Sequence, residues 1–522
     1  MRKDSQKAYQ AHINGLNEIS IAGTVIKDLV SEMKEIYLAD NRPWIIGFSG
    51  GKDSTVVLSL VYSMFVQLTE EERQKPVYVV SSDTLVETPV VVDLIQRVLK
   101  SINTEGERLG LPISAHAVYP EMDQTFWVNL LGRGYPAPKQ SFRWCTERMK
   151  ISPVSEFITE KVAQFGEVVV VLGSRSQESA SRAQVIAKHK IKGSALSRHT
   201  SLSNAYTYMP IEQWSADEVW EYLISAPCPW GGTNDELFGL YKDSNQGECP
   251  MVIDTSTPSC GNSRFGCWTC TVVTEDRALH GLIESGNSWM KSLLEFRNAL
   301  YESNEPENAE IYRHDKRRSN RITFRRARGD EKGELDTRQI RGPYKMKHRK
   351  DWLRNLLEIQ KKLEEEDHGF PLIREEELQH IRQQWLKDPI EPDVLDELPE
   401  IYREVYGDRI QWVENDAGSF TAPDAELLNK LGSRYNVSGD LVMKMIELEL
   451  SKSGMGKRSG IMKGLDSLLK QDWNIAEALD YRSEEFDKSM VWRDRINNLQ
   501  EKYTHAERLE KMLADESESL KL

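Results

Sequence analysis

Residues 43–54 read PWIIGFSGGKDS, an apolar run that leads into a glycine-rich loop, and a helix-like segment follows. A strand, a glycine-rich loop and a helix in this order form a phosphate-binding arrangement. Glycines let backbone N–H groups approach an anion, and the helix N-terminus adds a favourable dipole. Lys52 adds a positive charge. The nucleotide P-loop pattern GxxxxGK(S/T) does not fit, because Asp53 follows the lysine. The alternative is a strand-to-helix turn that merely needs Gly50 and Gly51.

The flanking segments predict the fold class. Four short apolar runs (PWIIGF, PVYVVSSD, PISAHAVYP and EVVVVLGSR) alternate with helix-like segments. This alternation predicts an α/β domain with a parallel sheet. Such sheets bind ligands at the carboxyl ends of their strands. The polar ends of three runs, at residues 49–54, 82–84 and 173–176, should therefore share one edge.

Composition divides the 522 residues into three parts. Residues 1–42 have the spacing of an N-terminal helical segment, and residues 43–290 form the α/β domain. Residues 291–522 are charged, mostly helical in pattern and without cysteine. The net charge of −14 argues against a protein that simply coats nucleic acid. The sequence has no signal peptide and no membrane-spanning run, so we expect a cytoplasmic protein with reduced cysteines.

The glycine-rich loop resembles the PP-loop of ATP pyrophosphatases, which split ATP between the α- and β-phosphates. The resemblance implies ATP, with Mg²⁺, as a cofactor, and it gives Lys52 and Asp53 catalytic roles. It also implies a cradle for the leaving pyrophosphate, made of Ser49, Gly50, Gly51, Lys52, Asp53 and Ser54.

Further segments resemble the phosphoadenylylsulfate reductase superfamily. SSDTLVETP matches the superfamily's DTGxxxPET segment and contributes Asp83 to the nucleotide site, but Leu85 replaces the glycine. RWCTERMKISP matches a CxxxKxxP segment. GSRSQESASR matches a third segment, which implies nucleotide contacts for Gly173, Arg175, Glu178 and Arg182. The fourth match is PIEQWSADEVWEYL. There we expect core residues that take no part in the chemistry: Pro210, Trp214, Val219 and Trp220.

The cysteines follow a metal-binding pattern. Cys260, Cys267 and Cys270 are spaced as CxxxxxxCxxC in SCGNSRFGCWTC. Four thiolates suit either tetrahedral zinc or a 4Fe–4S cluster, and the spacing alone does not separate them. The family match supplies Cys145 as the fourth ligand and favours the cluster. For Cys228 and Cys249 we expect a buried thiol or a cysteine that borders the loop, rather than a catalytic group.

Residues 313–350 are unusually basic. They carry 15 Lys or Arg against five Asp or Glu, which leaves −24 on the rest of the chain. Phe324 and Tyr344 interleave with these charges, and the combination is typical of contact with a phosphate backbone. The alternative is a solvated charged loop, or one docked on the acidic remainder.

The overall pattern resembles the DndC family of DNA phosphorothioation sulfurtransferases. That resemblance implies that a non-bridging oxygen of a DNA phosphate is adenylated and replaced by sulfur. It also implies three kinds of partner: DNA, a cysteine desulfurase as sulfur donor, and other subunits of a modification complex. Two other functions stay open. One is a sulfonucleotide reductase. Such an enzyme uses a cysteine near its C-terminus as the nucleophile, but the 252 residues after Cys270 contain no cysteine. The other is a non-catalytic ATP-binding scaffold.

Overall fold

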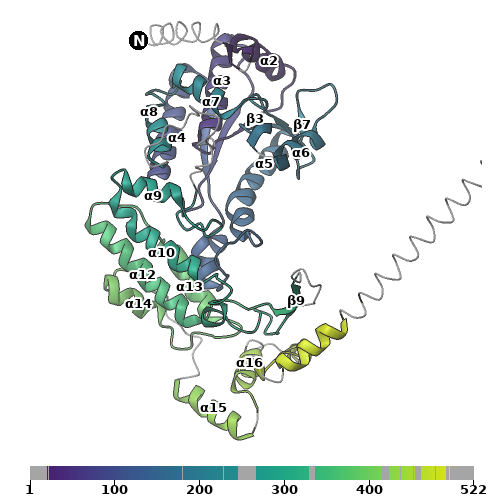
Figure 1. Ribbon diagram of the computed structural model, residues 1–522, viewed down its shortest axis with the longest axis vertical. Helices are drawn as coiled ribbons and strands as arrows, with labels where there is room; N and C mark the ends of the chain where they lie inside the picture. Colours follow the sequence, from purple (N-terminus) through teal and green to yellow (C-terminus); the bar gives the residue numbers. More distant parts are fainter. Residues whose placement is uncertain are drawn as a thin grey trace, which may run out of the picture. The chain divides into compact units, whose positions relative to one another are not determined.

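The computed structural model divides the chain into two compact units (Figure 1). It describes residues 20–244, 266–327, 336–413, 422–450, 452, 460–489 and 493, except positions 22, 179, 227, 436, 476 and 477. The first unit is cut as residues 1–130, 137–304 and 354–380, and the second as 131–136, 305–353 and 381–522. The three-part division by composition stays a prediction, and the compact units are cut at other places.

A six-stranded sheet is the centre of the first unit, with strand order β5-β4-β3-β6-β8-β7. Its strands are β3 (Trp44–Gly47), β4 (Val77–Ser82), β5 (Ile113–Val118), β6 (Val168–Val171), β7 (Ser197–Arg198) and β8 (Ala205–Tyr208). The first four pairings are parallel, and only the short edge strand β7 runs antiparallel to β8. The predicted parallel α/β domain is confirmed.

Helices cover both faces of this sheet. They are α2 (Ile26–Leu38), α3 (Lys52–Gln67), α4 (Pro89–Leu109), α5 (Ser152–Phe165), α6 (Ala180–His189), α7 (Ala216–Ser225) and α8 (Asp235–Asp243). Two short strands, β1 (Ser20–Ile21) and β2 (Thr24–Val25), precede α2. Alternate residues of β3 enter different cores: Trp44 and Ile46 pack in the core that holds α2 and α3, and Ile45 packs with Ile158 of α5. Both faces of the strand are therefore buried, as in other parallel sheets.

The chain continues in the first unit with α9 (Arg277–Glu284) and α10 (Lys291–Glu302). Two further helices, α12 (Met346–Glu365) and α13 (Glu375–Leu386), each contribute residues to both units. The other elements of the second unit are α11 (Ala309–Tyr312), β9 (Phe324–Ala327), β10 (Asp336–Gln339), α14 (Leu398–Tyr406), α15 (Ala422–Tyr435), α16 (Gly439–Leu450) and α17 (Ile461–Leu469). Strands β9 and β10 form an antiparallel two-stranded ribbon. Within the described ranges, no helix is both long and apolar enough to span a bilayer.

The strand order changes direction at β3, between β4 and β6. The chain passes from β3 to β4 and β5 on one side, and then crosses to β6 and β8 on the other. A crevice forms outside the strand ends at such a switch point, and it is the usual ligand site of an open α/β sheet. The loops after β3 and β6 meet at this position.

Candidate active site

The glycine-rich loop connects β3 to α3 as the sequence predicts. Gly50 has a φ of 70°, in the left-handed region, and a Cβ there would lie 2.5 Å from Cγ1 of Ile95. The carbonyl of Gly51 accepts hydrogen bonds from the N–H of Thr55 at 3.0 Å and from the hydroxyl of Ser54 at 2.9 Å. The loop thus closes tightly onto the first turn of α3. A buried helix N-terminus is a preorganised place for an anion.

A charged triad occupies this helix N-terminus. The Asp53 carboxylate lies between two cations: Nζ of Lys52 is 3.1 Å from Oδ2, and Nε of Arg175 is 2.5 Å from Oδ1. Both cations are buried, with exposed fractions of 6% for Lys52 and 5% for Arg175. Two cations and one carboxylate leave one net positive charge at this helix N-terminus, which favours binding of a polyphosphate.

The loop after β6 is fixed directly on the glycine-rich loop. A Cβ on Gly173 would lie 2.8 Å from the backbone carbon and oxygen of Asp53, so only glycine allows this close approach. Nη1 of Arg175 donates to the carbonyl of Trp214 at 3.1 Å, and its backbone N–H donates to Oε1 of Glu178 at 3.4 Å. The guanidinium is therefore held in one orientation beside Asp53.

These loops line a cleft of about 760 Å³. The volume lies within the range of ordinary small-molecule sites. The structure places eight residues that the sequence predicts in its wall: Ser49, Gly51, Lys52, Asp53, Ser54, Gly173, Arg175 and Glu178. Gly50 shapes the loop from behind and lines a neighbouring cavity. Arg182 falls in α6, and its side chain is outside the described set.

The loop between β4 and α4, residues 83–88 (the second loop below), has a left-handed backbone at position 85 although that residue is not glycine. Leu85 has a φ of 65°, and its N–H donates to Oδ1 of Asp83 at 2.8 Å. Burial raises the pKa of the Asp83 carboxyl, while this N–H and the charge of Arg374 act to lower it. Ser82 lines the cleft beside this loop. Asp83 therefore stabilises the backbone of this loop through its hydrogen bond with Leu85, and it lies close to the cleft.

The cysteine segment is joined to the same loop by backbone hydrogen bonds. The N–H of Trp268 donates to the carbonyl of Val86 at 3.1 Å, and that of Thr88 donates to Gly266 at 3.2 Å. Sγ of Cys267 lies 3.3 Å from the hydroxyl of Thr84. The thiol thus lies behind the loop that borders the cleft.

Two cysteines, Cys145 and Cys267, lie near one lysine, Lys150. Lys150 pairs with Glu87 at 3.0 Å, and the pKa of its ammonium is raised by Cys267 first, and also by Glu87 and Cys145. Burial raises the pKa of the Cys145 thiol, and the charge of Cys270 adds to this. Glu87 and Lys150 also line the cleft, so the thiols lie at its border.

The described residues provide only part of a metal-ligand set. Cys260 lies outside them, and among them no group of three or more His, Cys, Asp or Glu side chains is arranged to hold a metal ion. Cys145 and Cys267 each lie near enough to Cys270 for their charges to interact, so three of the four predicted ligands are neighbours. Cys228 is half-buried against the core, and burial raises the pKa of its thiol to about 12, in agreement with the expectation of a buried thiol. Cys249 is outside the described residues.

Some site residues were not found from the sequence. The hydroxyl of Tyr241, on α8, lies 3.4 Å from the backbone nitrogen of Lys52. Arg297, 1% exposed on α10, donates from Nε to the carbonyl of Cys270 at 2.9 Å. For Arg297, the sequence signal was the presence of an arginine within the apolar pattern SLLEFRNAL. Of the expected core residues, Trp214, Val219 and Trp220 are buried and Pro210 is half-buried.

Comparison with known proteins agrees with this geometry. Residues 43–273 match the family model described as the phosphoadenosine phosphosulfate reductase domain. The matched region contains the six-stranded sheet and the candidate active site. An uncharacterized protein of Methanocaldococcus jannaschii is 28% identical over 212 residues, which are 41% of this chain and 38% of that protein. The chain thus spans well under half the length of this curated relative.

Three solved structures show low overall similarity. The phosphoadenylyl-sulfate reductase of Candida auris is 16% identical over 40% of this chain and 87% of its own, with a TM-score of 0.24. The FMN adenylyltransferase of Candida glabrata is 12% identical over 54% and 81%, with a TM-score of 0.29. The U34-tRNA thiolase NcsA of Methanococcus maripaludis, solved with its 4Fe–4S cluster, is 14% identical over 53% and 82%, with a TM-score of 0.23.

Proposed function

We propose that this protein is an ATP pyrophosphatase that activates an acceptor oxygen for replacement by sulfur. The observation that carries the proposal is the triad of Lys52, Asp53 and Arg175 at the N-terminus of α3. It lies in a nucleotide-sized cleft whose border also carries the cysteine segment. A phosphate site and thiols at one sheet edge suit a reaction that couples ATP cleavage to sulfur transfer.

In this reaction the cleft stabilises the leaving pyrophosphate. Lys52 and the N–H groups of the first turn of α3 neutralise the charge that develops when the bond between the α- and β-phosphates breaks. Arg175 offers a planar guanidinium for phosphate oxygens. Asp53 suits the Mg²⁺ that accompanies ATP, since a carboxylate oxygen is a preferred ligand of that ion.

The acceptor in this proposal is a non-bridging oxygen of a DNA phosphate. That oxygen attacks the α-phosphorus of ATP, pyrophosphate leaves, and the DNA phosphate becomes adenylated. A cysteine desulfurase supplies sulfur as a persulfide, and a thiol reductant releases it as hydrosulfide while being oxidised to a disulfide. The hydrosulfide then attacks the DNA phosphorus, and AMP leaves with the original oxygen. Other subunits of a modification complex select the site. The support is the resemblance to the DndC family together with the thiols beside the cleft.

A 4Fe–4S cluster on Cys145, Cys260, Cys267 and Cys270 is part of the proposal. When bound, it would supply iron sites with affinity for sulfur at the border of the cleft. The chain's own contribution is to hold this segment in place: Arg297 fixes the carbonyl of Cys270, and the second loop fixes Cys267.

Product analysis of ATP turnover tests the first half of the reaction. We expect AMP and pyrophosphate, and ADP with phosphate would refute the proposal. Lys52→Ala should lower the rate at least 10²-fold, as for loss of a preorganised charge donor. Lys75→Ala is the matched control, because Lys75 is also a buried lysine (7% exposed) paired with a carboxylate, Asp40, but lies outside the cleft lining. It should lower stability and leave the products and the rate unchanged below its unfolding temperature.

The match of residues 43–273 supports one alternative, a sulfonucleotide reductase. That enzyme would release sulfite from a free sulfonucleotide without DNA. Mass spectrometry of digested DNA for phosphorothioate linkages, run beside a sulfite assay, separates the two activities. A chain that binds ATP without turning it over in the intact modification complex would instead be a scaffold.

A further inference from the structure

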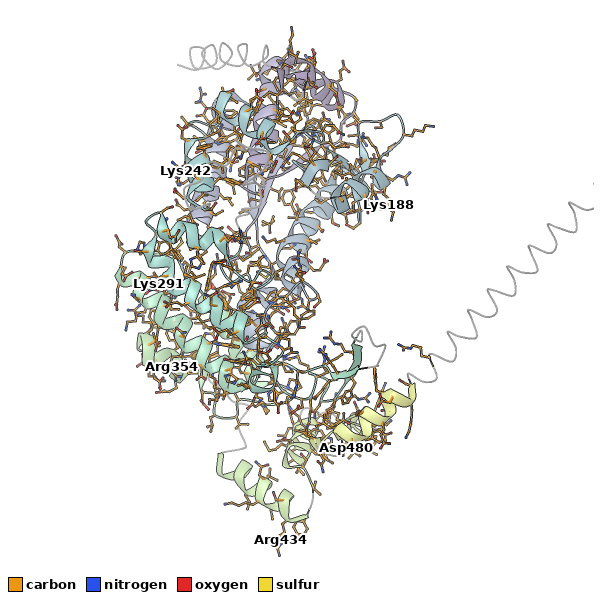
Figure 2. The ribbon with its side chains drawn as sticks, viewed as in Figure 1. Lys188, Lys242, Lys291, Arg354, Arg434 and Asp480 are labelled. Carbon is orange, nitrogen blue, oxygen red and sulfur yellow. The ribbon has the colours of Figure 1, made fainter. Side chains whose placement is uncertain are left out.

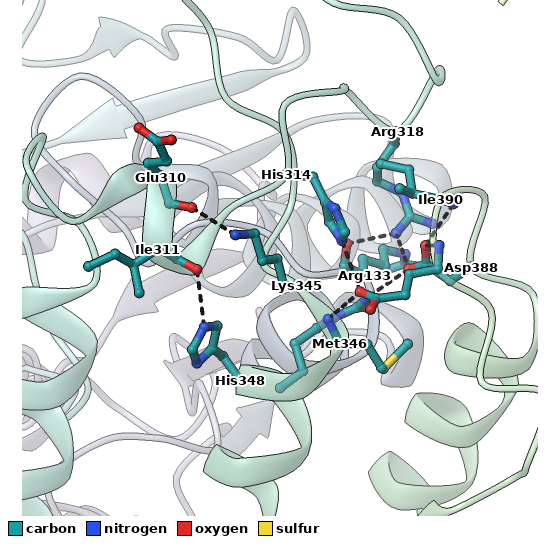
Figure 3. A network of polar contacts seen from close by, with 12 residues as sticks. Arg133, Glu310, Ile311, His314, Arg318, Lys345, Met346, His348, Asp388 and Ile390 are labelled. Atoms are coloured by element: carbon teal, nitrogen blue, oxygen red, sulfur yellow. Dashed lines mark hydrogen bonds and ion pairs between the residues drawn. The ribbon is translucent and has the colours of Figure 1, made fainter. Parts of the chain in front are cut away.

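Several cations of the basic segment 313–350 are committed to contacts within the second unit. Arg349 is fully buried, and its Nη2 lies 3.0 Å from Oδ2 of Asp388. Figure 3 shows Arg318 turned toward the same carboxylate and toward the carbonyl of Arg133, to which it donates at 2.6 Å. These arginines bind acceptors of their own unit, so the charge count of this segment overstates what it offers to a ligand.

A second basic stretch belongs to the first unit, which also holds the cleft. Residues 179–211 contain five Lys or Arg, two His and no Asp or Glu. At the chain's average of 82 acidic residues in 522, a stretch of this length would hold about five. A region of one sign in a chain with a net charge of −14 is a candidate anion-binding surface.

Helix α6 and strand β7 bring these cations together. Lys188 lies in the last turn of α6, Arg198 lies on β7, and both are exposed. A β-bridge between Lys190 and Ser197 joins the end of the helix to the strand. Lys192, in the turn between the two elements, is exposed as well. Three exposed cations therefore surround one junction of helix and strand.

These three cations are not neutralised by neighbouring carboxylates. Within the part of the chain that the structure describes, the side chains of Lys188, Lys192 and Arg198 have no hydrogen-bond or ion-pair partner. Lys190 differs, because it is paired with Glu212 at 3.3 Å. The junction therefore keeps three positive charges that are available to an anion.

Two histidines belong to the same surface. Nδ1 of His199 accepts the backbone N–H of Leu202 at 3.2 Å, so the proton of the neutral ring is on Nε2. Burial lowers the pKa of His199, and the charge of His189 lowers it further. This interaction shows that the His189 ring of α6 is near the His199 ring that follows β7. The Nε2–H of His199 remains as a donor for an anion.

Two structural roles account for part of this charge. Lys188 and His189 lie in the last turn of α6, where positive charge interacts favourably with the helix dipole. Arg198 lies on an edge strand, where a charge opposes pairing with another chain. An acidic residue would serve the second role as well, and neither role involves Lys192. The uniform positive sign therefore needs a further explanation.

The surface is within reach of a polymer that is held in the cleft. Gln177 and Glu178 line the cleft, and α6 begins two residues later at Ala180. A helix of 10 residues is about 15 Å long, so Lys188 lies up to about that distance from the cleft wall. Phosphates on one strand of a duplex are about 3.4 Å apart along its axis, so the distance corresponds to about four base pairs. A duplex with one phosphate in the cleft can therefore contact these cations through neighbouring phosphates.

We propose that the α6–β7 surface, defined by Lys188, Lys192, Arg198 and His199, binds backbone phosphates of double-stranded DNA beside the phosphate that enters the cleft. The choice of DNA rests on the proposed function. Lysine and arginine contacts to phosphates hold a duplex in position without reading its sequence. Because the chain as a whole is acidic, a local basic surface is needed to attract the duplex to the cleft.

Fluorescence anisotropy with a 20-base-pair duplex in 50–200 mM KCl tests the inference, using the full-length triple variant Lys188→Gln, Lys192→Gln, Arg198→Gln. Loss of three phosphate contacts should reduce the slope of log K against log salt by about 2.7, and affinity at 100 mM should fall on the order of 10²-fold. The charge-conserving variant Lys188→Arg, Lys192→Arg, Arg198→Lys should keep the slope of the wild type.

The matched control neutralises three exposed lysines on other helices of the same unit: Lys100, Lys242 and Lys291. Figure 2 labels Lys242 and Lys291 on the opposite side of the view from Lys188. The control variant removes the same amount of charge as the triple variant. It should leave the slope unchanged.

Equal slopes for the neutralised variant and the wild type would overturn the inference, and so would an equal loss in the control or in the charge-conserving variant. Tighter binding of an RNA duplex of the same length, lost in the same neutralised variant, would overturn the choice of DNA. ATP cleavage by the wild type is measured separately, without DNA. Its failure would refute the proposed function and would leave the measured slopes as they are, so the two failures are distinguishable.

Discussion

Leu85 gives the sharpest test of the loop geometry. Its φ of 65° is a conformation that glycine adopts freely and leucine does not. The left-handed region costs a residue with a Cβ about 1–2 kcal/mol. The strain persists because the Leu85 N–H is held by Asp83 at 2.8 Å and the neighbouring Val86 accepts from Trp268.

The variants Leu85→Ala and Leu85→Gly separate strain from packing. Alanine removes the half-buried side chain but keeps the Cβ and hence the strain. Glycine removes both, and regains about 1–2 kcal/mol of strain against about 0.4–1 kcal/mol for its greater freedom in the unfolded chain. We therefore expect Leu85→Gly to be more stable than Leu85→Ala by about 0.5–1 kcal/mol.

Urea unfolding at 25 °C, followed by tryptophan fluorescence, measures this difference. Ala299→Gly, inside α10, is the control with ordinary helical backbone, and there glycine should be less stable by about 1 kcal/mol. Opposite signs at the two positions are the signature of strain at Leu85. If glycine is also the less stable residue at position 85, the loop does not hold a left-handed conformation and its resemblance to a glycine-containing loop is only apparent.

Two further predictions follow from the first unit. Gly50→Ala should lower the free energy of unfolding by about 2–4 kcal/mol and weaken ATP binding, because backbone strain adds to overlap with Ile95. The control is Gly110→Ala, where φ is 62° and the space around the residue is open, so it should cost only about 1–2 kcal/mol and leave ATP binding unchanged. Unfolding curves and nucleotide titration measure the two effects. Burial raises the pKa of Glu377 to about 7, above its unfolded value, so the folded protein loses stability as pH rises from about 4.5 to 7. Glu377→Gln should therefore be more stable than the wild type at pH 8, by up to about 3 kcal/mol, and this gain should vanish near pH 4.5 in unfolding curves; a gain independent of pH would show that the carboxyl is not the cause.

The sheet and its glycine-rich loop could be predicted because their signals are local. A run such as WIIG, buried on both faces, needs only its own composition to indicate a parallel strand. The carboxyl ends of such strands share an edge by geometry, which brings Ser49, Ser82 and Gly173 into one cleft. Nothing about distant partners enters this reasoning.

Partners from distant helices could not be predicted in the same way. Amphipathic spacing shows that a helix buries one face, but not against what. Residues 354–380 belong to the first unit, where the indole N–H of Trp127 donates to the carbonyl of Leu372 at 2.7 Å. Arg374 then lies near enough to affect the pKa of Asp83. Net charge has the same weakness, since a count cannot separate buried Arg349 from exposed Arg325.

The hydrogen bonds between the second loop and the cysteine segment carry a mechanistic consequence. Glu87 lines the cleft, pairs with Lys150 and lies 3.7 Å from Sγ of Cys267. Its backbone also forms a β-bridge with Cys267, so the two segments are joined at this point. We expect a change in the cleft that displaces this loop to displace the thiol as well. In the proposed reaction this connection matters, because the sulfur must attack only after the acceptor oxygen has been adenylated. A shared backbone ladder gives the phosphate site and the sulfur site one common frame, which two independent loops would not provide.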